Sequence, residues 1–333
     1  MFESSNHQFI VGGETMKSEV MKFYADREDV TLTTYVISDS PELLGGKKRP
    51  AILICPGGAY LSCSDREGEA VALRFAAMGY HAFVLRYSTY MEGKPGFPDI
   101  QSEMKVNENC LHPSPMREIG KAMLTIREHA EEWLIEVDKI ALCGFSAGAH
   151  NCAMYSVYWD KPIIHEYFNE KPELFKPAAT ILGYTLSDYL FMRSFPKSPI
   201  DTKLFEAANL AFTGNKEPDE ETLKEISPAL HVSESTPPMF LWATSEDTLV
   251  PAQHTLRMAH ALADKNIPYE VHIYEKGPHG LSLSNQATAQ AKSQIYQDAA
   301  RWIVEAEAWL EKRFALELPE RTQFELMEKE QNW

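Results

Sequence analysis

Cysteine is scarce in this chain, and its spacing excludes the sites that cysteine usually builds. Only five of the 333 residues are cysteines, and no two of them stand in a C-x-x-C arrangement. An odd number at irregular spacing favours neither a disulfide framework nor a zinc site. Cys55 and Cys143 fall within apolar runs, where a thiol packs as a small hydrophobe. These features predict a protein of a reducing cytoplasm.

The chain also lacks a long apolar run and an excess of positive charge. Residues 1–16 are polar and lack the hydrophobic core of a signal peptide. No stretch approaches the roughly 20 apolar residues of a membrane span. The formal net charge of −16 repels nucleic acid and anionic membrane surfaces, so we expect neither as a partner.

No internal repeats or low-complexity tracts divide the chain. Its 333 residues slightly exceed the roughly 250–300 at which one core stops growing. With 44% hydrophobic and 24% charged residues, the composition is that of a globular enzyme. We expect a single catalytic domain over residues 1–333, with insertions at 89–114 and 184–228.

Apolar runs alternate with helical stretches, and this order predicts the fold class. The predicted strands are the apolar runs 51–55, 80–87, 139–143, 178–183, 238–243 and 269–274. Helices are expected over 64–78, 115–133, 149–159 and 287–313, with one more beginning near 252. Strands and helices in this order predict an α/β fold built on a doubly wound, mostly parallel sheet.

Local patterns add three finer predictions. Alternating residues over 30–37 predict an edge strand in a leading hairpin. Ser64 and Glu67 have the Ser-x-x-Glu spacing of a capping box that opens the first helix. The last helix is expected to run from Ala287 to Arg313.

The two insertions interrupt the alternation at the expected carboxyl edge of the sheet. Residues 89–114 carry Gly, Pro and polar residues with little periodicity, and residues 184–228 mix aromatic residues with charges. Long insertions at this edge usually shape or cover a substrate pocket, as an inserted cap or lid. The alternative for 184–228 is that it only packs on the body of the domain.

The stretch Gly144–Gly148 has the G-x-S-x-G pattern of a nucleophile elbow. A strand-like run, Lys139–Cys143, precedes it, and a helix-like segment begins at Ala149. An elbow needs this context because the serine stands at the apex of a sharp turn from strand to helix. The sequence therefore predicts Ser146 as a catalytic nucleophile.

A nucleophilic serine needs a base and an orienting carboxylate, which follow it in the order acid, then histidine, in this type of site. Two acids, Glu246 and Asp247, follow the predicted strand 238–243. Asp247 is favoured because it begins a D-x-x-V-P sequence that leads into a helix near Ala252. Asp247 is therefore the predicted acid, with Glu246 as its competitor.

The predicted base is His279, in the Gly-Pro-His-Gly loop that follows the strand 269–274. A histidine in a loop after a strand can turn toward the serine. By contrast, His272 lies within that strand and is expected on its face. His150, on the helix after the elbow, is expected to be structural.

An oxyanion site is predicted upstream, in the loop Pro56–Tyr60. This loop follows the apolar run 51–55, the place of the glycine-rich oxyanion loop in esterases. Its glycines let backbone N–H groups point into the site without obstruction. The predicted donors are the N–H groups of Gly58 and Ala59, together with that of Ala147 just after the nucleophile.

The loop 56–60, the elbow 144–150, Asp247–Pro251 and Gly277–Gly280 together resemble the α/β-hydrolase superfamily. Within it, the P-G-G-x-Y loop and the G-F-S-A-G-x-H elbow are similar to those of bacterial acetyl-xylan-esterase and feruloyl-esterase-like carboxylesterases. The resemblance covers roughly 47–310 without the insertions. Many members have a third glycine where this chain has Ala59, which disfavours bulky esters of tertiary alcohols.

This resemblance implies hydrolysis of an ester, often removal of acetyl groups from plant-derived sugars, without a metal or an organic cofactor. Ser146 would attack the ester carbonyl while His279 takes its proton and Asp247 orients the imidazole. The expected partner is a small ester such as an acetylated oligosaccharide. The oligomeric state, including a homodimer, stays open.

Two other functions share parts of this pattern. Peptidases of the prolyl-oligopeptidase type have the same order of triad residues, but they usually carry a large propeller domain for which this chain has no room. Non-catalytic hormone receptors with a hydrolase fold tend to lose a triad member, and all three candidates are present here. The sequence therefore favours a serine esterase.

Overall fold

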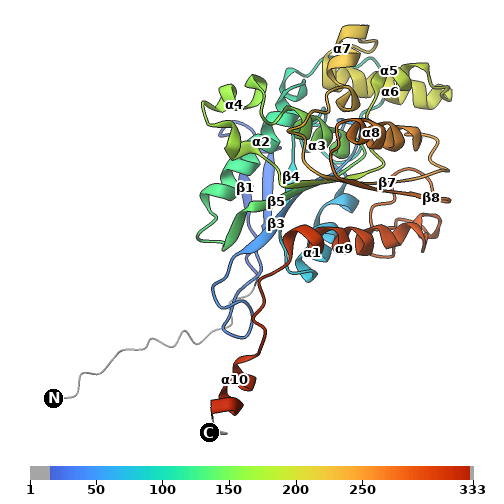
Figure 1. The fold of residues 1–333 in the computed structure, drawn as a ribbon. Coiled ribbons are helices and arrows are strands. Elements are labelled where there is room, and N and C mark those ends of the chain that lie inside the picture. Colours follow the sequence, from blue (N-terminus) through green and yellow to red (C-terminus); the bar gives the residue numbers. More distant parts are fainter. Residues whose placement is uncertain (1–15, 331–333) are drawn as a thin grey trace.

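An eight-stranded sheet forms the centre of the molecule, which we describe from a computed structural model of residues 16–330 (Figure 1). Its strand order is β1-β2-β4-β3-β5-β6-β7-β8. The strands are β1 (Val20–Lys22), β2 (Thr31–Tyr35), β3 (Arg49–Cys55), β4 (His81–Arg86), β5 (Ile135–Phe145), β6 (Ala179–Gly183), β7 (Met239–Thr244) and β8 (Tyr269–Tyr274). The prediction for residues 1–16 lies outside the described residues, apart from Met16.

The sheet is parallel from β4 to β8, and β1 and β2 are antiparallel additions at one end. All seven residues of β3 are buried, as are all six of β7. Strands covered on both faces have continuous apolar sequences, which is why runs such as 51–55 could be recognised. The predicted doubly wound, mostly parallel sheet is confirmed.

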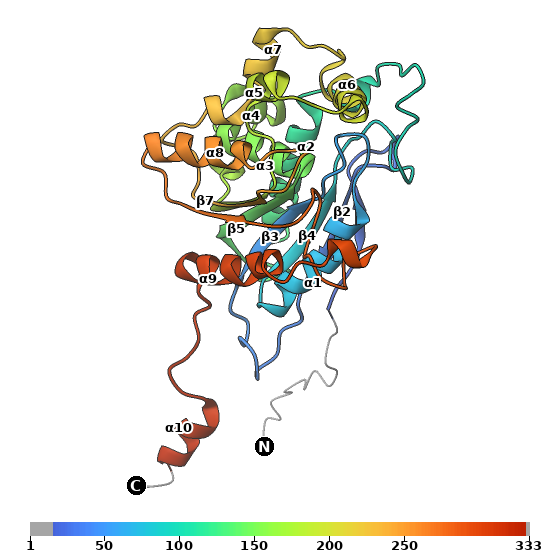
Figure 2. The ribbon, with the colours of Figure 1, turned by 90° about the vertical axis from the view of Figure 1, so that its right-hand side faces the viewer.

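Helices cover both faces of the sheet, and the strand residues alternate between two hydrophobic clusters. Ile52 and Ile54 pack with α1 (Glu69–Ala77) and α9 (Trp302–Phe314). Leu53, between them, belongs to the other cluster, which includes residues of α2 (Ser114–Glu128), α3 (Ala147–Tyr158) and α8 (Gln253–Asp264). Figures 1 and 2 show these two layers below and above the sheet.

Both insertions leave from carboxyl ends of parallel strands, 89–114 after β4 and 184–228 after β6. The second insertion folds into three helices that lie together above the sheet in both views (Figures 1 and 2). Cys110 donates a hydrogen bond to the Ala211 carbonyl, and the His112 N–H donates to the Phe212 carbonyl at 2.7 Å. The two insertions are therefore joined to each other.

The remaining elements are five helices and six 3₁₀ turns within residues 16–330. The helices of the second insertion are α5 (Tyr189–Ser194), α6 (Pro199–Thr213) and α7 (Glu220–Glu225), α4 (Pro162–Phe168) follows α3, and α10 (Gln323–Glu330) ends the described chain. The 3₁₀ turns are η1 (Asp65–Glu67), η2 (Glu108–Cys110), η3 (Pro172–Phe175), η4 (Pro228–Leu230), η5 (Lys292–Gln294) and η6 (Ala299–Arg301).

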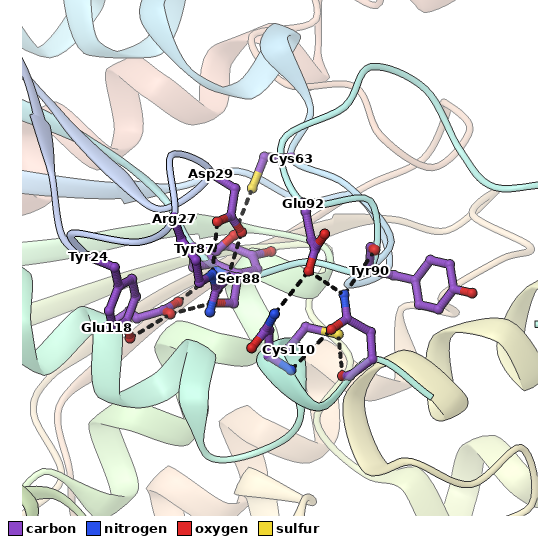
Figure 3. A network of polar contacts seen from close by, with 12 residues as sticks. Tyr24, Arg27, Asp29, Cys63, Tyr87, Ser88, Tyr90, Glu92, Cys110 and Glu118 are labelled. Atoms are coloured by element: carbon purple, nitrogen blue, oxygen red, sulfur yellow. Dashed lines mark hydrogen bonds and ion pairs between the residues drawn. The ribbon is translucent and has the colours of Figure 1, made fainter. Parts of the chain in front are cut away.

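A buried polar network fastens the end of β4 to α2 and to the loop before β2 (Figure 3). The carboxylate of Glu118, 1% exposed, accepts hydrogen bonds from the Ser88 N–H at 2.7 Å, the Ser88 hydroxyl, and the Tyr24 hydroxyl at 3.1 Å. Arg27 donates to Ser88 Oγ at 2.9 Å and forms a two-bond ion pair with Asp29. The network fixes the chain just where the first insertion begins.

All three finer predictions were wrong at least in part, and two of them concern the sheet and the last helix. The leading hairpin is confirmed, because β1 and β2 pair antiparallel, but the strand within 30–37 is not at an edge: β2 lies between β1 and β4, and β1 forms the edge. The last helix begins at Trp302 rather than Ala287. The segment before it contains two 3₁₀ turns, and its path is set by contacts such as the bond from the Trp302 indole to the Ser282 carbonyl at 2.8 Å.

Candidate active site

A sharp turn between β5 and α3 carries Ser146 in strained geometry. Its φ of +51° and ψ of −120° lie outside the regions that L-residues normally adopt. A Cβ atom added at Gly144 would lie 2.4 Å from the Gly148 carbonyl oxygen. One added at Gly148 would lie 2.1 Å from the Cys55 carbonyl oxygen. Backbone atoms cannot yield to such contacts, so both glycines of the motif are needed for the turn.

The serine, histidine and aspartate predicted from separate loops meet above this turn. Ser146 Oγ lies 2.8 Å from His279 Nε2, and His279 Nδ1 lies 2.7 Å from Asp247 Oδ2. The other oxygen of Asp247 accepts the N–H groups of Leu249 and Val250 at 3.0 and 2.9 Å. The D-x-x-V-P sequence thus folds back on its own carboxylate and holds it toward the imidazole.

The competing acid has a different position. Glu246 is exposed and accepts the Gly277 N–H at 3.0 Å, so it braces the histidine loop without reaching His279. His272 lies on β8, where it contacts Glu270 and the Phe240 ring, as expected of a strand residue. The structure therefore brings Asp247, and not Glu246, to the imidazole.

Two carboxylates influence the charge of His279. Burial by itself lowers the pKa of the imidazole, because it disfavours the cation. The charge of Asp247 and its hydrogen bond, followed by the charge of Glu67, outweigh burial and leave the pKa raised above its ordinary value. The site therefore stabilises the imidazolium that forms when a base accepts a proton.

His150 is neutral and links three parts of the site. Its Nε2 lies 2.8 Å from the Ile226 carbonyl and its Nδ1 lies 2.6 Å from the Tyr60 hydroxyl. A carbonyl only accepts, so Nε2 carries the proton and Nδ1 accepts from Tyr60. Burial lowers the pKa of His150 to about 4. As predicted, this histidine is structural, and it ties the second insertion to the oxyanion loop.

The predicted oxyanion loop turns sharply after β3. Gly58, Ala59 and Tyr60 all have positive φ, of +132°, +56° and +57°. Ala147 is the first residue of α3, so its N–H has no acceptor within the helix. Ala59 and Ala147 line a cavity together with Ser146, whereas Gly58 does not line it. Two of the three predicted donors thus border the space next to the serine.

That cavity is small and almost entirely apolar. It leaves about 50 Å³ for the centres of water-sized molecules. Its walls come from the oxyanion loop, the elbow, the second insertion and the loop after β7, and include Tyr60, Leu186, Tyr189, Phe205, Leu249 and Val250. A small apolar group attached to the Ser146 oxygen is what this space can hold.

A second, larger cavity adjoins the first within the second insertion. It measures about 560 Å³ and shares the Tyr189 and Phe205 side chains with the small cavity. Polar and charged side chains, among them Arg193 and Asn209, line it beside aromatic rings. The 184–228 insertion therefore contributes walls to two neighbouring spaces, one almost entirely apolar and one of mixed polar and apolar character.

Comparison with known proteins identifies the family. The BD-FAE family model matches residues 44–262, which is most of the chain from β3 to α8. The chain belongs to the BD-FAE family. Its fold is the α/β-hydrolase fold, as the resemblance implied.

Individual relatives of this BD-FAE protein agree with that placement. It is 32% identical over 243 residues to endo-1,4-beta-xylanase B of Butyrivibrio fibrisolvens, covering 72% of this chain and 33% of that protein. MGS-M1, an alpha/beta hydrolase enzyme from a Medee basin deep-sea metagenome library, is 30% identical with a TM-score of 0.65, covering 90% of this chain and 98% of the other.

An acetyl ester-xyloside bifunctional hydrolase from Caldicellulosiruptor lactoaceticus has the same fold, with a TM-score of 0.69 at 24% identity, covering 90% and 98% of the two chains. The chain spans between a third and a half of the length of the curated relatives that it matches.

Sequence reasoning missed two residues beside the site of this BD-FAE protein, Glu67 and Tyr184. The predicted capping box was wrong, because the Ser64 side chain makes no capping bond and α1 begins only at Glu69. Glu67 instead turns inward, 3% exposed, and binds Gly57 and Tyr184. The sequence position of Glu67 could have indicated this role, because Glu67 lies in the segment between β3 and α1 that begins with the oxyanion loop.

Neither a metal cluster nor a membrane helix appears in the described part of the chain. Within residues 16–330, no three His, Cys, Asp or Glu side chains gather as metal ligands would. No helix in that range combines the length and apolarity needed to cross a bilayer. The five cysteines are all free thiols, and only Cys63 is partly exposed.

Proposed function

We propose that this chain hydrolyses short acyl esters, chiefly acetyl esters of plant-derived oligosaccharides, through an acyl-enzyme on Ser146. The observation that carries the proposal is the hydrogen-bonded series from Ser146 through His279 to Asp247. Ser146, at the start of the series, borders a small apolar cavity. This is the arrangement of a nucleophile, a general base and an orienting carboxylate.

In the first step Ser146 Oγ attacks the ester carbonyl carbon, and His279 Nε2 takes the hydroxyl proton. The carbonyl oxygen becomes an oxyanion that accepts hydrogen bonds from the N–H groups of Ala59 and Ala147, the two predicted donors that border the small cavity. Asp247 stabilises the imidazolium. The imidazolium then gives its proton to the leaving alcohol, and the C–O bond breaks to leave an acyl-serine.

In the second step a water molecule attacks the acyl-serine, and His279 accepts its proton as the same general base. The second tetrahedral intermediate uses the same oxyanion donors; the imidazolium then gives its proton to Ser146 Oγ as the C–O bond to the serine breaks, which releases the carboxylic acid and restores Ser146 and neutral His279. Each such donor contributes about 3 kcal/mol to the transition state in comparable sites. No cofactor enters the proposed cycle.

The size of the small cavity supports a short acyl group. A single water needs at least about 10–15 Å³, so a space of about 50 Å³ fits an acetyl or propionyl chain. The BD-FAE family groups bifunctional acetyl xylan and feruloyl esterases. An aromatic feruloyl group exceeds this cavity, which favours the acetyl activity for this chain.

The larger cavity supports a carbohydrate as the alcohol. Aromatic rings beside polar side chains suit a sugar, which presents apolar C–H faces and hydroxyl groups. Two similar proteins are named as a xylanase and as an acetyl ester-xyloside hydrolase. We therefore propose acetylated xylo-oligosaccharides as the substrate class, with the acyl group in the small cavity and the sugar toward the large one.

A substrate panel tests this proposal. Rates are measured for p-nitrophenyl esters from acetate to octanoate, for methyl ferulate, and for acetylated xylo-oligosaccharides. We expect a maximum at acetate or propionate, a steep fall by octanoate and little turnover of ferulate. A maximum at octanoate or longer would indicate a lipase-like pocket and would contradict the sugar-deacetylase proposal.

A matched variant separates the two cavities. Phe195 lines the large cavity but not the small one. Phe195→Ala should weaken turnover of acetylated xylo-oligosaccharides more than turnover of p-nitrophenyl acetate. Equal losses of activity on both substrates would show that the large cavity does not bind the sugar.

A further inference from the structure

A buried carboxylate lies between the oxyanion loop and the histidine loop. Glu67, in the turn before α1, is 3% exposed. Its Oε2 accepts the Gly57 N–H at 2.7 Å, and its Oε1 accepts the Tyr184 hydroxyl at 2.5 Å. An ideal Cβ at Gly57 would lie 2.8 Å from both Glu67 Oε2 and Ser146 Cβ. Only a glycine at 57 lets the carboxylate come so close to the nucleophile.

Tyr184 connects this carboxylate to His279. It follows β6 directly, has a positive φ of +38°, and is 2% exposed. Its ring meets the His279 ring edge to face, with 5.0 Å between the centroids and 72° between the planes. Its hydroxyl oxygen accepts the Ser282 N–H at 3.0 Å, three residues beyond His279.

The hydrogen-bond donors around Glu67 match the ionised form of its side chain. The Gly57 and Ser282 N–H groups can only donate, so the Tyr184 oxygen accepts from Ser282 and its own proton is directed to Glu67. Both oxygens of Glu67 are then acceptors. This pattern fits a carboxylate and leaves no acceptor for a carboxyl proton.

The charged and titratable groups around Glu67 come from four elements. They are Arg66 beside it in the turn, Tyr184 after β6, His279 after β8, and the Cys143 thiol on β5. Burial leaves the pKa of Glu67 raised above its ordinary value, and the bonds from Tyr184 and Gly57 and the charges of His279 and Arg66 reduce that rise without cancelling it. In return, the charge of Glu67 favours the protonated form of His279.

Arg66 strengthens the same connection. Its guanidinium donates to the Gly280 carbonyl at 2.9 Å and to the Thr288 carbonyl. Its own carbonyl accepts the Ser282 hydroxyl at 2.6 Å. The turn that carries Glu67 is therefore bonded directly to the chain that follows His279.

We propose that Glu67 is a positioning residue for ester hydrolysis: its carboxylate fixes the oxyanion loop through Gly57 and, through Tyr184 and its own charge, supports the protonated form of His279. The proposal rests on the function proposed above. Glu67 touches neither substrate nor reacting atoms. Its contribution grows in the transition state, because the imidazolium and the oxyanion both form there.

The central variant is Glu67→Gln, which keeps the shape and removes one acceptor. If the amide NH₂ faces the Gly57 N–H, two donors meet. If it faces Tyr184 instead, the hydroxyl proton of Tyr184 has no acceptor. We expect kcat for p-nitrophenyl acetate to fall about tenfold to a hundredfold with little change in KM. The acid limb of kcat/KM should move to lower pH, because His279 loses a stabilising charge.

Two further variants make the result specific. Tyr184→Phe keeps the ring on His279 but removes the hydroxyl, and should lower kcat less than Glu67→Gln does. Glu69→Gln is the matched control, because Glu69 is an exposed carboxylate two residues away that binds Tyr35. It should leave kcat and the pH profile unchanged. Circular dichroism and melting temperatures show whether each variant is folded.

The outcomes separate this proposal from the one on which it depends. A wild-type chain without esterase activity would overturn both. An active wild type with an unchanged acid limb in folded Glu67→Gln would overturn the positioning role alone, whether or not kcat falls. If Glu67→Gln does not fold, Tyr184→Phe decides, since wild-type kcat in that variant contradicts the connection.

Discussion

His279 donates a 2.7 Å hydrogen bond from Nδ1 to Asp247, a carboxylate that is only 4% exposed and accepts two further backbone N–H groups. The carboxylate is thus fixed before the imidazole reaches it. This bond also settles which ring nitrogen faces the serine, because a proton held on Nδ1 leaves Nε2 free to accept. The proposed base therefore has the correct tautomer at rest.

The first prediction concerns the two neighbouring acids. Asp247→Asn should lower kcat/KM for p-nitrophenyl acetate by about 10⁴-fold, because the amide favours the wrong imidazole tautomer. Glu246→Gln should retain most activity, since Glu246 contacts only the Gly277 N–H. The reverse ranking of the two variants in steady-state assays would transfer the orienting role to Glu246.

The second prediction is the pH dependence of activity. His279 must be neutral to accept the serine proton, so kcat/KM falls as the imidazole becomes protonated. Because its pKa is raised, the acid limb should lie on the alkaline side of an ordinary histidine, that is, above about 6.5. Initial rates across pH 4–9 measure this limb. Undiminished activity at pH 4 would argue against a histidine base.

The third prediction concerns stability and the network of Figure 3. Burial raises the pKa of Glu118 from 4.5 to about 7 in the folded chain. A raised pKa favours folding below the unfolded value and loses that contribution as pH rises through the folded value. Stability should therefore fall by on the order of 3 kcal/mol from pH 4.5 to above pH 7 because of this group.

Melting temperatures of Glu118→Gln test that sign. The variant cannot titrate, so its melting temperature should change less between pH 5 and pH 8 than that of the wild type. Glu128→Gln, an exposed change at the end of the same helix, is the control and should keep the wild-type slope. An equal slope in Glu118→Gln would mean that Glu118 does not titrate in this range.

The fourth prediction concerns acyl length. Phe205 stands between the small and the large cavity, so Phe205→Ala should join them. The rate on p-nitrophenyl octanoate relative to acetate should then rise by roughly tenfold, the scale that added apolar contacts allow. Phe97→Ala removes an exposed ring from the first insertion and should leave the ratio unchanged. An unchanged ratio in Phe205→Ala would place the acyl group elsewhere.

The features that sequence predicted correctly are local ones. The buried run 51–55 and the Gly-x-Ser-x-Gly turn specify their own backbone, and the turn leaves no space for side chains at Gly144 or Gly148. Parallel strands then bring the loops after β5, β7 and β8 to one edge, which is why three distant motifs could be combined.

The features that sequence missed depend on distant partners. Glu67 fits a capping box locally, but its donors are 10 and 117 residues away. Leaving these buried donors without an acceptor would cost more free energy than one capping bond at an exposed helix end contributes. The interior position of β2 depends on β1, which is only three residues long and gives little periodic signal. The start of α9 at Trp302 depends on a bond from the indole to the Ser282 carbonyl, 20 residues earlier in the chain.

The most direct test of the central claim is the turnover of p-nitrophenyl acetate by Ser146→Ala beside the wild type. The substitution removes only Oγ, so the fold and the melting temperature should be kept. We predict that kcat falls by more than about a hundredfold, because triad losses are usually larger than that. A folded Ser146→Ala protein that keeps more than about a hundredth of the wild-type kcat would contradict the nucleophile and the acyl-enzyme mechanism built on it.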